Sequence, residues 1–316
     1  MSIRNKLLQT LEGTTGKVYS GEVLAREHGV SRTAIWKQVQ GLRDAGFPIE
    51  SMGRQGYRLL VPFDSSLSSY SGSGKIVPHY SMTTQSTQML AKAGAAAELP
   101  EGHVWVSEIQ TKGRGRLERA WESSYGGLWF SILLRPNLAA SRVAPLTLLA
   151  GVCLREAIYH VSGLDLKLKW PNDLLIQSGG IWKKCAGILT EMSGQLDRAD
   201  WVIVGVGVNV NNRISQTLEG RASSLAGLSG RSWSRALFLE SFIDLFMRDY
   251  HKFKVDGFAG FRARYWKNYY APRKLMVLKS ALGLISGKAV GIDAHGAIMI
   301  ESRRKIRTFV EGEVVL

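Results

Sequence analysis

The sequence has very little cysteine: Cys153 and Cys185 are the only two among 316 residues. Each stands in an apolar stretch, and their separation is not that of a pair of metal ligands. Free cysteine behaves as a small apolar residue and is among the most frequently buried types. We therefore expect two buried, reduced thiols and no cysteine-based metal centre.

Long apolar runs are also missing. Crossing a bilayer takes about 20 consecutive apolar residues, and no stretch of the chain approaches that length. The first residues, Met1 to Lys6, lead into an amphipathic segment rather than an apolar signal core. These absences favour a soluble, cytoplasmic protein that has no membrane partner.

Acidic residues are scarce relative to basic ones. Lys and Arg together number 41 against 26 for Asp and Glu, so the formal net charge is +15. A charge of this size attracts polyanions such as nucleic acid, nucleotides or acidic proteins, although it carries no information about the fold. Hydrophobic residues make up 45% of the chain, which excludes disorder by composition. The length is typical of two or three domains.

Residues 1–62 have the pattern of a winged helix-turn-helix. Ser20 and Ser31 are placed to cap a second and a third short helix, and a His-Gly-Val turn separates the two. Gly46 would end the third helix. Residues 49–59 put apolar residues on both sides of a Gly-Arg-Gln-Gly tip, which predicts a β-hairpin wing.

In a winged helix, the outer face of the third helix enters the major groove of DNA and the wing lies beside the phosphates. The candidate DNA contacts are therefore polar or aromatic residues of this helix and two arginines of the wing, namely Ser31, Arg32, Thr33, Trp36, Lys37, Gln40, Arg54 and Arg58. A small helical packing module that binds no DNA is the open alternative, because winged helices also serve as protein docking domains.

A stretch rich in Ser and Gly, residues 63–75, predicts a linker. From residue 76 to 270 the pattern is mixed helix and strand. Apolar residues predict strands at 127–134 and 201–210, among others, and a long helix from Arg142 to Val161. Apolar and polar residues alternate from Leu164 to Trp170, which predicts another strand. The middle of the chain is therefore expected to be an α/β domain.

Four motifs in this middle part suggest a site for anions. The first, Lys112–Trp121, is a loop with glycines that let a ligand approach the backbone and with three arginines that suit phosphate or carboxylate. The second, Lys169–Asp173, has a proline that stops a strand, followed by the polar residues Asn172 and Asp173; the carboxylate oxygens of Asp173 suit Mg²⁺. Taken alone, an exposed basic turn and a pair of turn-forming residues remain the alternative readings.

The third motif puts Lys184 at the start of an apolar strand, where it could neutralise a carboxylate or a phosphate, although an exposed edge lysine has the same pattern. The fourth motif is Val204–Val210. Strand alternation puts Gly205, Gly207 and Asn209 on one face, which leaves a bare surface for a flat ligand or for a closely packed helix.

Together, in this order and after a winged helix, these motifs resemble the bacterial biotin–protein ligases of the bifunctional repressor type. The resemblance covers essentially the whole chain. The pieces that carry it are Gly113–Arg116, Lys169–Asp173, Lys184 with Ala186–Leu189, and Gly205–Asn209.

This resemblance implies an α+β protein of three domains: a winged helix at 1–62, a catalytic domain at 76–270 like the core of class II aminoacyl-tRNA synthetases, and an SH3-like β-barrel at 271–316. The last part has short β-rich runs and turns at 293–296 and 311–313, which fits a barrel. The resemblance also implies two steps. Biotin and Mg-ATP form biotinyl-5′-AMP, and a lysine of the biotin carboxyl carrier protein of acetyl-CoA carboxylase then takes the biotin.

The resemblance further implies roles for individual residues. Biotin would be bound by Ser86, Thr87, Gln110, Gly113, Arg114, Gly115, Arg116, Lys184, Gly187, Gly205 and Gly207. The nucleotide would be bound by Arg119, Trp121, Lys169, Asn172 and Asn209, and Asp173 would hold Mg²⁺. Lys184, Arg116 and Arg119 would be catalytic. The expected partners are the carrier protein, operator DNA, and a second copy of the chain once the adenylate is bound.

This chain departs from the family pattern at two places. It has Gln85-Ser86-Thr87-Gln88 where the family usually has Asp-Ser-Thr-Asn, and Glu118 stands where the loop commonly has glycine. Three other functions remain open: a ligase without repressor activity, a regulator that has lost catalysis, and a lipoate ligase. Lys184 and Arg116 argue against lost catalysis, and the Gly-Arg-Gly-Arg loop favours biotin over lipoate.

Overall fold

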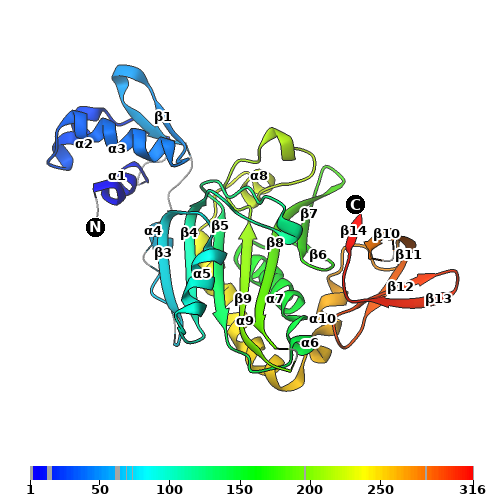
Figure 1. The fold of residues 1–316 in the computed structure, drawn as a ribbon. Coiled ribbons are helices and arrows are strands. Elements are labelled where there is room, and N and C mark those ends of the chain that lie inside the picture. The colour runs from blue at the N-terminus through cyan, green and yellow to red at the C-terminus, as the bar shows by residue number, and fades with distance from the viewer. Residues whose placement is uncertain are drawn as a thin grey trace.

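The computed structural model describes residues 3–12, 16–60, 65–68, 70–72, 74–195, 197–281 and 283–315. It has three parts in chain order (Figure 1): a small helical part, a central sheet with helices, and a C-terminal sheet. The helical part and the C-terminal sheet lie at opposite ends, with the central part between them. None of the helices in the described ranges is long and apolar enough to cross a membrane.

The N-terminal part is the predicted winged helix. Ser20 and Ser31 cap the second and third helices, since their side chains accept hydrogen bonds from Val23 N and Ala34 N at 3.1 Å. Gly46, with φ +92°, follows the third helix as expected. The elements are α1 (Ile3–Glu12), α2 (Gly21–Glu27), α3 (Arg32–Asp44), β1 (Ile49–Ser51), the short η1 (Gly53–Gln55) and β2 (Tyr57–Leu59), with β1 and β2 paired antiparallel.

The central part is built on one seven-stranded sheet with the order β3-β4-β5-β9-β8-β7-β6. β3 and β4 run parallel, whereas every other neighbouring pair is antiparallel. The strands are β3 (Val77–Thr84), β4 (His103–Gln110), β5 (Leu128–Leu134), β6 (Lys167–Lys169), β7 (Asp173–Ser178), β8 (Ile181–Gly194) and β9 (Ala199–Val208). This mixed sheet confirms the expected α/β character of the middle of the chain.

Helices cover the two faces of this sheet unequally. The long helices α7 (Leu146–Ser162) and α9 (Arg235–Asp256) pack against each other and share the main apolar core with the sheet. The opposite face carries α5 (Thr87–Ala96), which contacts β4, β5 and β9. Part of that face is left for a site. The remaining helical elements are α4 (Ser65–Ser68), η2 (Arg116–Glu118), α6 (Ala140–Val143), η3 (Gln216–Leu218), α8 (Leu225–Ser229), η4 (Ala259–Phe261) and α10 (Arg262–Lys267).

Two predicted boundaries need correction. The helix expected from Arg142 to Val161 is divided into α6 and α7 at Pro145, because proline has no N–H to continue the hydrogen-bond ladder. Within the predicted linker 63–75, the described residues 65–68 form α4, and Leu67 is 1% exposed in the main core. The serine-rich composition of this segment concealed its one core leucine. Residues 63, 64, 69 and 73 of the predicted linker lie outside the described residues.

The C-terminal part is a five-stranded antiparallel sheet with the order β13-β12-β11-β10-β14. Among the described residues no pairing joins β13 to β14, so the sheet is open where a barrel was expected. The turn at 293–296 is confirmed, and Trp170 donates to Gly296 O at 3.0 Å, which ties this part to the central domain. The strands are β10 (Leu275–Ser280), β11 (Gly283–Ile292), β12 (Ile298–Ser302), β13 (Lys305–Phe309) and β14 (Glu313–Val315).

Candidate active site

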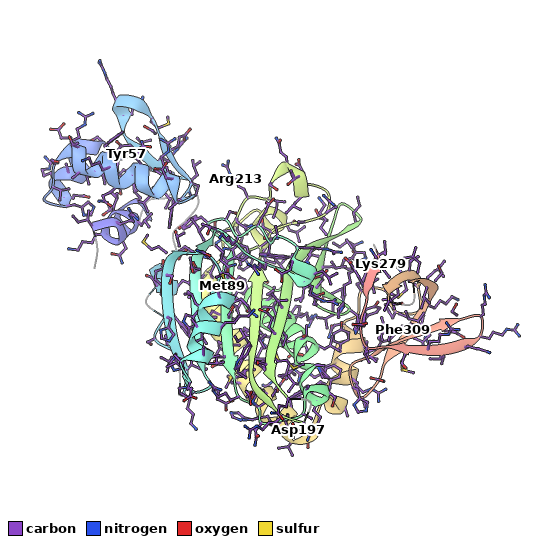
Figure 2. All side chains as sticks on the ribbon, in the orientation of Figure 1. Tyr57, Met89, Asp197, Arg213, Lys279 and Phe309 are labelled. Carbon is purple, nitrogen blue, oxygen red and sulfur yellow. The ribbon has the colours of Figure 1, made fainter. Side chains whose placement is uncertain are left out.

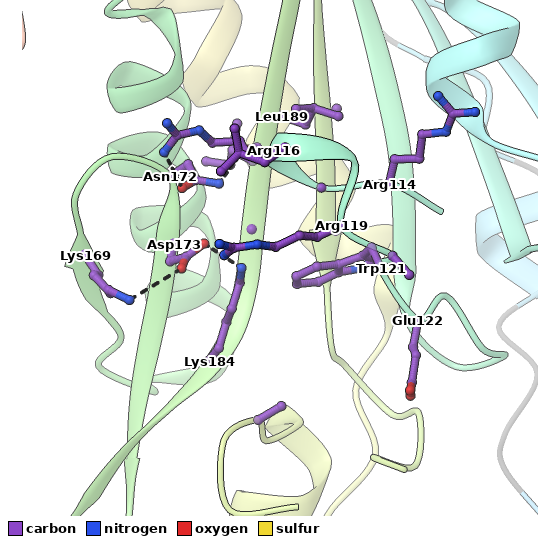
Figure 3. Close-up of a pocket in the computed structure, with 18 of the residues that line it drawn as sticks. Arg114, Arg116, Arg119, Trp121, Glu122, Lys169, Asn172, Asp173, Lys184 and Leu189 are labelled. Atoms are coloured by element: carbon purple, nitrogen blue, oxygen red, sulfur yellow. Dashed lines mark hydrogen bonds and ion pairs between the residues drawn. The ribbon is translucent and has the colours of Figure 1, made fainter. Parts of the chain in front are cut away.

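A cavity of about 890 Å³ lies on the face of the central sheet that α5 leaves partly open. The loop 112–121 and the C-terminal residues 311–313 contribute to its walls. The structure brings together in it every residue predicted to bind biotin, nucleotide or metal except Gly113 (Figure 3).

The arginine-rich loop folds back on itself as a narrow hairpin. Gly115 N donates to Arg119 O at 2.8 Å, and Trp121 N donates to Gly113 O at 2.9 Å. A Cβ atom on Gly113 would lie 2.4 Å from Trp121 O, so this glycine serves the closure of the loop rather than the cavity wall. At the tip, Leu117 and Glu118 both have φ +55°, a left-handed conformation that favours glycine.

The predicted glycine-rich floor exists, and side chains cover it. The Trp121 indole lies over Gly187 and Gly207: a Cβ atom on Gly207 would be 2.7 Å from Trp121 Nε1, and one on Gly187 would be 3.2 Å from the ring. The Gln88 amide lies over Gly205, 2.4 Å from the position of a Cβ atom. The indole N–H is buried without a hydrogen-bond partner. The three glycines therefore leave space for flat groups, and in this structure the Trp121 indole and the Gln88 amide occupy that space.

A network of amides and hydroxyls surrounds the start of α5. Thr87 donates to Gln110 Oε1 from both its backbone N, at 2.8 Å, and its hydroxyl, at 3.1 Å. Gln110 Nε2 donates to Ser123 Oγ at 2.8 Å, and Ser131 Oγ donates to Gln88 Oε1 at 2.9 Å. This network orients polar groups beside the glycine floor, where an uncharged polar ring could bind.

Asp173 stands between two lysines. Its carboxylate lies 2.7 Å from Lys184 Nζ and 4.0 Å from Lys169 Nζ (Figure 3). Burial lowers the pKa of Lys169, and Asp173 opposes that shift. Lys184 also lies 4.9 Å from the centroid of the Trp121 ring, within cation–π range. Two cations thus converge on the cavity with one carboxylate between them.

Two arginines of the loop connect it to the C-terminal part. Arg116 donates to Gly312 O at 3.1 Å and lies 3.5 Å from Asn172 Oδ1. Arg119 forms a bidentate ion pair with Glu313. One of its two hydrogen bonds, from Nη2 to Glu313 Oε2, is 2.7 Å long. Burial lowers the pKa of Arg116, whereas the hydrogen bonds from Arg119 lower the pKa of Glu313. The C-terminal part is thus a wall of the site.

The far end of the cavity contains a pair of buried asparagines. Asn212 Nδ2 donates to Asn209 Oδ1 at 3.0 Å, and Asn212 Oδ1 is buried without a partner. Both side chains line the cavity, as do Arg213 and Arg221. Amide donors and acceptors of this kind suit the edge of a nucleobase.

Several lining residues were not predicted. Asn212 repeats the asparagine of the fourth motif three residues later, which is a signal that could have been used. Ser131, Trp182 and the segment 311–313 had no comparable signal, since they reach the cavity only through pairing between distant strands and docking of the C-terminal part.

Asp173 alone does not make a metal centre. Among the described ranges of the chain, no three His, Cys, Asp or Glu side chains are grouped as ligands. Lysine ammonium groups lie 2.7 Å from Oδ1 and 4.0 Å from Oδ2 of Asp173, so this carboxylate already faces two positive charges. The residues therefore do not fit a resident Mg²⁺ ion.

The predicted DNA-contact residues lie on α3 and on the wing. Arg32, Thr33, Trp36 and Lys37 are exposed, and Trp36 is 51% exposed, which is unusual for so large an apolar side chain. Arg58 forms an ion pair with Glu50 across the hairpin, so part of its charge is neutralised, whereas Arg54 is exposed at the tip.

Comparisons with known proteins agree with this geometry. The biotin/lipoate A/B protein ligase family matches residues 80–209, and a helix-turn-helix domain family matches residues 3–58. The bifunctional ligase/repressor BirA of Bacillus spizizenii is 32% identical over 100% of this chain and 99% of its own length. BirA of Escherichia coli is 29% identical over 95% of this chain and 94% of its own.

A solved structure of biotin protein ligase from Aquifex aeolicus in complex with biotin and ATP is also similar. It has a TM-score of 0.66 and 32% identity, and the match covers 75% of this chain and 97% of that one. Because the likeness to the Bacillus protein runs along the whole chain, this protein belongs to the BirA family of bifunctional biotin ligase/repressors.

Proposed function

We propose that this protein activates biotin with ATP and transfers it to a lysine of the biotin carboxyl carrier protein of acetyl-CoA carboxylase. The observation that carries the proposal is the cavity itself. A glycine floor under Trp121 meets two lysines and two arginines there, between the polar network of α5 and the buried asparagines. The proposal also agrees with the comparisons, because the similar proteins include biotin ligases.

In the first step, an oxygen of the biotin carboxylate attacks the α-phosphorus of ATP, and pyrophosphate leaves. Two anions must approach each other, so positive charge is needed where they meet. We assign this task to Lys184 and Arg116, with Asp173 holding Lys184 toward the cavity. Arg119 and Lys169 would serve the nucleotide phosphates, Trp121 and Asn172 would also contact the nucleotide, and Asn209 the base.

In the second step, the uncharged amine of the acceptor lysine attacks the carbonyl carbon of the mixed anhydride. AMP leaves and the amine loses a proton. The anhydride must be kept from water until then. The loop around Arg116, held by the Gly312 carbonyl, is suited to cover it.

Magnesium would enter with the phosphates of ATP rather than occupy a site of its own, because Asp173 is engaged by Lys169 and Lys184. We assign no step to it. We also propose that the central domain has the organisation of class II aminoacyl-tRNA synthetases. The C-terminal sheet, bent by the bulge between Ala289 and Gly291, would be an SH3-like module.

The test is biotin-dependent exchange between pyrophosphate and ATP, with lipoate in place of biotin as the control acid. We expect exchange with biotin alone. Lys184→Ala should reduce it about 100-fold or more, because removing one charged donor at a developing anion costs roughly that factor. Lys183→Ala removes the neighbouring charge, which does not line the cavity, and should leave the rate within about two-fold. Exchange with neither acid would disprove the proposal.

We further propose that the winged helix represses biotin genes, that biotinyl-5′-AMP is the corepressor, and that the protein binds DNA as a homodimer in the cytoplasm. A two-fold operator would match a two-fold protein. The exposed polar face of α3 supports DNA contact.

Operator binding should require both biotin and ATP in a mobility-shift assay. Lys37→Ala should weaken it several-fold and reduce its salt dependence, since each phosphate contact releases bound counterions. Lys252→Ala removes one exposed charge from α9 and is the matched control. Binding that is unaffected by biotin and ATP would favour a ligase whose winged helix has another role.

A further inference from the structure

Residues 213–221, here called the wall segment, connect two parts of the cavity. The segment begins directly after Asn212 of the buried asparagine pair. It ends beside Lys184, whose backbone N donates to Arg221 O at 2.8 Å and whose backbone O accepts from Ser223 N at 3.0 Å. Several of its residues line the cavity, namely Arg213, Ile214, Leu218, Gly220 and Arg221. The segment is therefore a wall that runs from the asparagines to the lysine proposed to act at the α-phosphate.

The carboxylate of Glu122, the residue after the arginine loop, contacts the middle of this wall. Ser215 Oγ donates to Glu122 Oε1 at 2.9 Å, and Thr217 Oγ1 donates to the same oxygen at 3.4 Å. The two hydroxyl oxygens lie 2.8 Å from each other. Arg221 Nη2 donates to Thr217 O at 3.0 Å, which folds the wall segment back on itself. One carboxylate oxygen thus connects the wall to the loop on the other side of the cavity.

The acidity of Glu122 is unexpected in a cavity that is rich in cations. A carboxylate in a site for anions repels them unless it is paired or turned away. Two other lining carboxylates, Asp173 and Glu313, contact lysines or arginine. The contacts of Glu122 with the wall are made by uncharged hydroxyls, and Figure 3 shows its carboxylate directed away from Lys184, toward which the Trp121 ring points. Neutralising a cation does not explain this residue, whereas holding the wall does.

The backbone on both sides of Glu122 is fixed. Trp121 N donates to Gly113 O at 2.9 Å, and Gln110 N donates to Ser123 O at 3.0 Å. The wall segment has little regular structure of its own, since it contains the three-residue η3 and is otherwise irregular. Hydrogen bonds to an ionised acceptor are stronger than those between neutral groups. The fixed carboxylate is therefore suited to hold the wall, rather than the wall to hold the carboxylate.

We propose that Glu122 is a positioning residue that keeps the wall segment closed over the nucleotide through the hydroxyls of Ser215 and Thr217. The inference rests on the proposed ligase function and adds a residue that controls how long ATP and the adenylate stay in the cavity. Glu122 acts through the wall and takes no part in the reaction itself. Biotin on the glycine floor keeps its own contacts, so its affinity does not depend on Glu122.

The experiment separates the hydrogen bonds of Glu122 from its charge. Glu122→Ala removes the acceptor, whereas Glu122→Gln keeps an oxygen at the same position without the charge. Ser215→Ala/Thr217→Val removes the two donors, and a triple variant combines these changes with Glu122→Ala. Glu219→Ala is the matched control, because it removes an exposed carboxylate from the same segment that does not line the cavity.

The kinetic readouts are KM for ATP and the maximal rate in biotin-dependent exchange. Calorimetry gives Kd for biotin and for an analogue of biotinyl-5′-AMP in which an unreactive sulfamate replaces the anhydride. We expect Glu122→Ala and the donor variant each to raise KM for ATP and Kd for the analogue about five-fold, the scale of one hydrogen bond. The maximal rate and Kd for biotin should stay within about two-fold, and Glu122→Gln and Glu219→Ala should resemble the unsubstituted protein.

The triple variant should be no weaker than either of its parents, because both remove the same contact. Effects that multiply to about 25-fold would mean that the residues act independently, and would overturn the proposal. Unchanged KM and Kd in Glu122→Ala would overturn it too, as would a Glu122→Gln variant as weak as Glu122→Ala. Absence of exchange in the unsubstituted protein would refute the ligase function, whereas Kd for the analogue would still decide the role of Glu122. An unsubstituted protein that does not bind the analogue would overturn both.

Discussion

At the scale of single residues, the glycines of the floor decide what can lie in the cavity. Strand alternation predicted that Gly205 and Gly207 share a bare face, and they do. The side chains that cover them could not be predicted, because Gln88 and Trp121 arrive from distant segments. Gln88, which replaces the usual family asparagine, is longer by one methylene, and its amide lies in the space that Gly205 leaves free.

Gly207→Ala should therefore weaken biotin binding. A methyl group there would lie 2.7 Å from Trp121 Nε1, so the indole must move off the floor. We expect the Kd for biotin, measured by calorimetry, to rise about ten-fold, which corresponds to about 1.4 kcal/mol. Gly291→Ala is the matched change in a strand, where the added methyl would meet only Met299 Sδ at 3.5 Å. An unchanged Kd in the first variant would show that the Trp121 position does not matter for biotin.

At the scale of elements, periodicity predicted the winged helix, the strands of the motifs and most helices. Periodicity did not predict the length of a strand where that length depends on pairing with other strands. The alternation from Leu164 to Trp170 predicted a longer strand, but only Lys167–Lys169 pair as β6. The strand is confined to the edge of the sheet, where β7 is its one neighbour in the described sheet. Local pattern cannot reveal how many residues of a strand find a partner.

The edge pair β3 and β4 holds two histidines that should make stability depend on pH. His79 Nε2 and His103 Nδ1 are 2.8 Å apart, and both rings stack near Trp105. Burial, and then the charge of His79, lower the pKa of His103 below its usual 6.5. The folded state therefore binds fewer protons than the unfolded state, so this stability is complete above pH 6.5 and is lost as the pH falls.

We expect the urea midpoint of unfolding to fall between pH 7 and pH 5. His103→Gln keeps a hydrogen-bonding group but cannot be charged, so it should flatten this dependence. His251→Gln, at an exposed position of α9, should leave the slope as it is. Equal slopes in the two variants would contradict the role of His103.

At the scale of the whole molecule, the order of the three parts was predictable and their contacts were not. The winged helix meets the central domain through Phe47, whose ring centroid lies 4.7 Å from that of Tyr125. Ile109 joins the same apolar cluster, one residue before Gln110 of the polar network. No local pattern could indicate that Phe47, a core residue of the winged helix, also packs against the central domain.

Phe47→Leu should loosen the winged helix while keeping its core apolar. Aromatic pairs contribute about 0.5–1.5 kcal/mol beyond their burial, so the undocked population should rise roughly three- to ten-fold. Amide relaxation by NMR should show faster tumbling of residues 16–60. Biotin-dependent exchange should stay within about two-fold. Phe253→Leu changes a buried residue away from this contact and should leave the tumbling of residues 16–60 unchanged. Equal tumbling rates in the two variants would mean that Phe47 does not fix the winged helix to the central domain.

The contacts of Gly312 and Glu313 with the arginine loop also determine when, during translation, the site can be completed. Arg116 and Gly312 are 196 positions apart, and Arg119 and Glu313 are 194 apart. On the ribosome, the loop and the glycine floor emerge long before the residues that hold the loop. A nascent chain would therefore acquire the binding surface first and its cover last, so a reactive anhydride would be protected only once translation had passed residue 313.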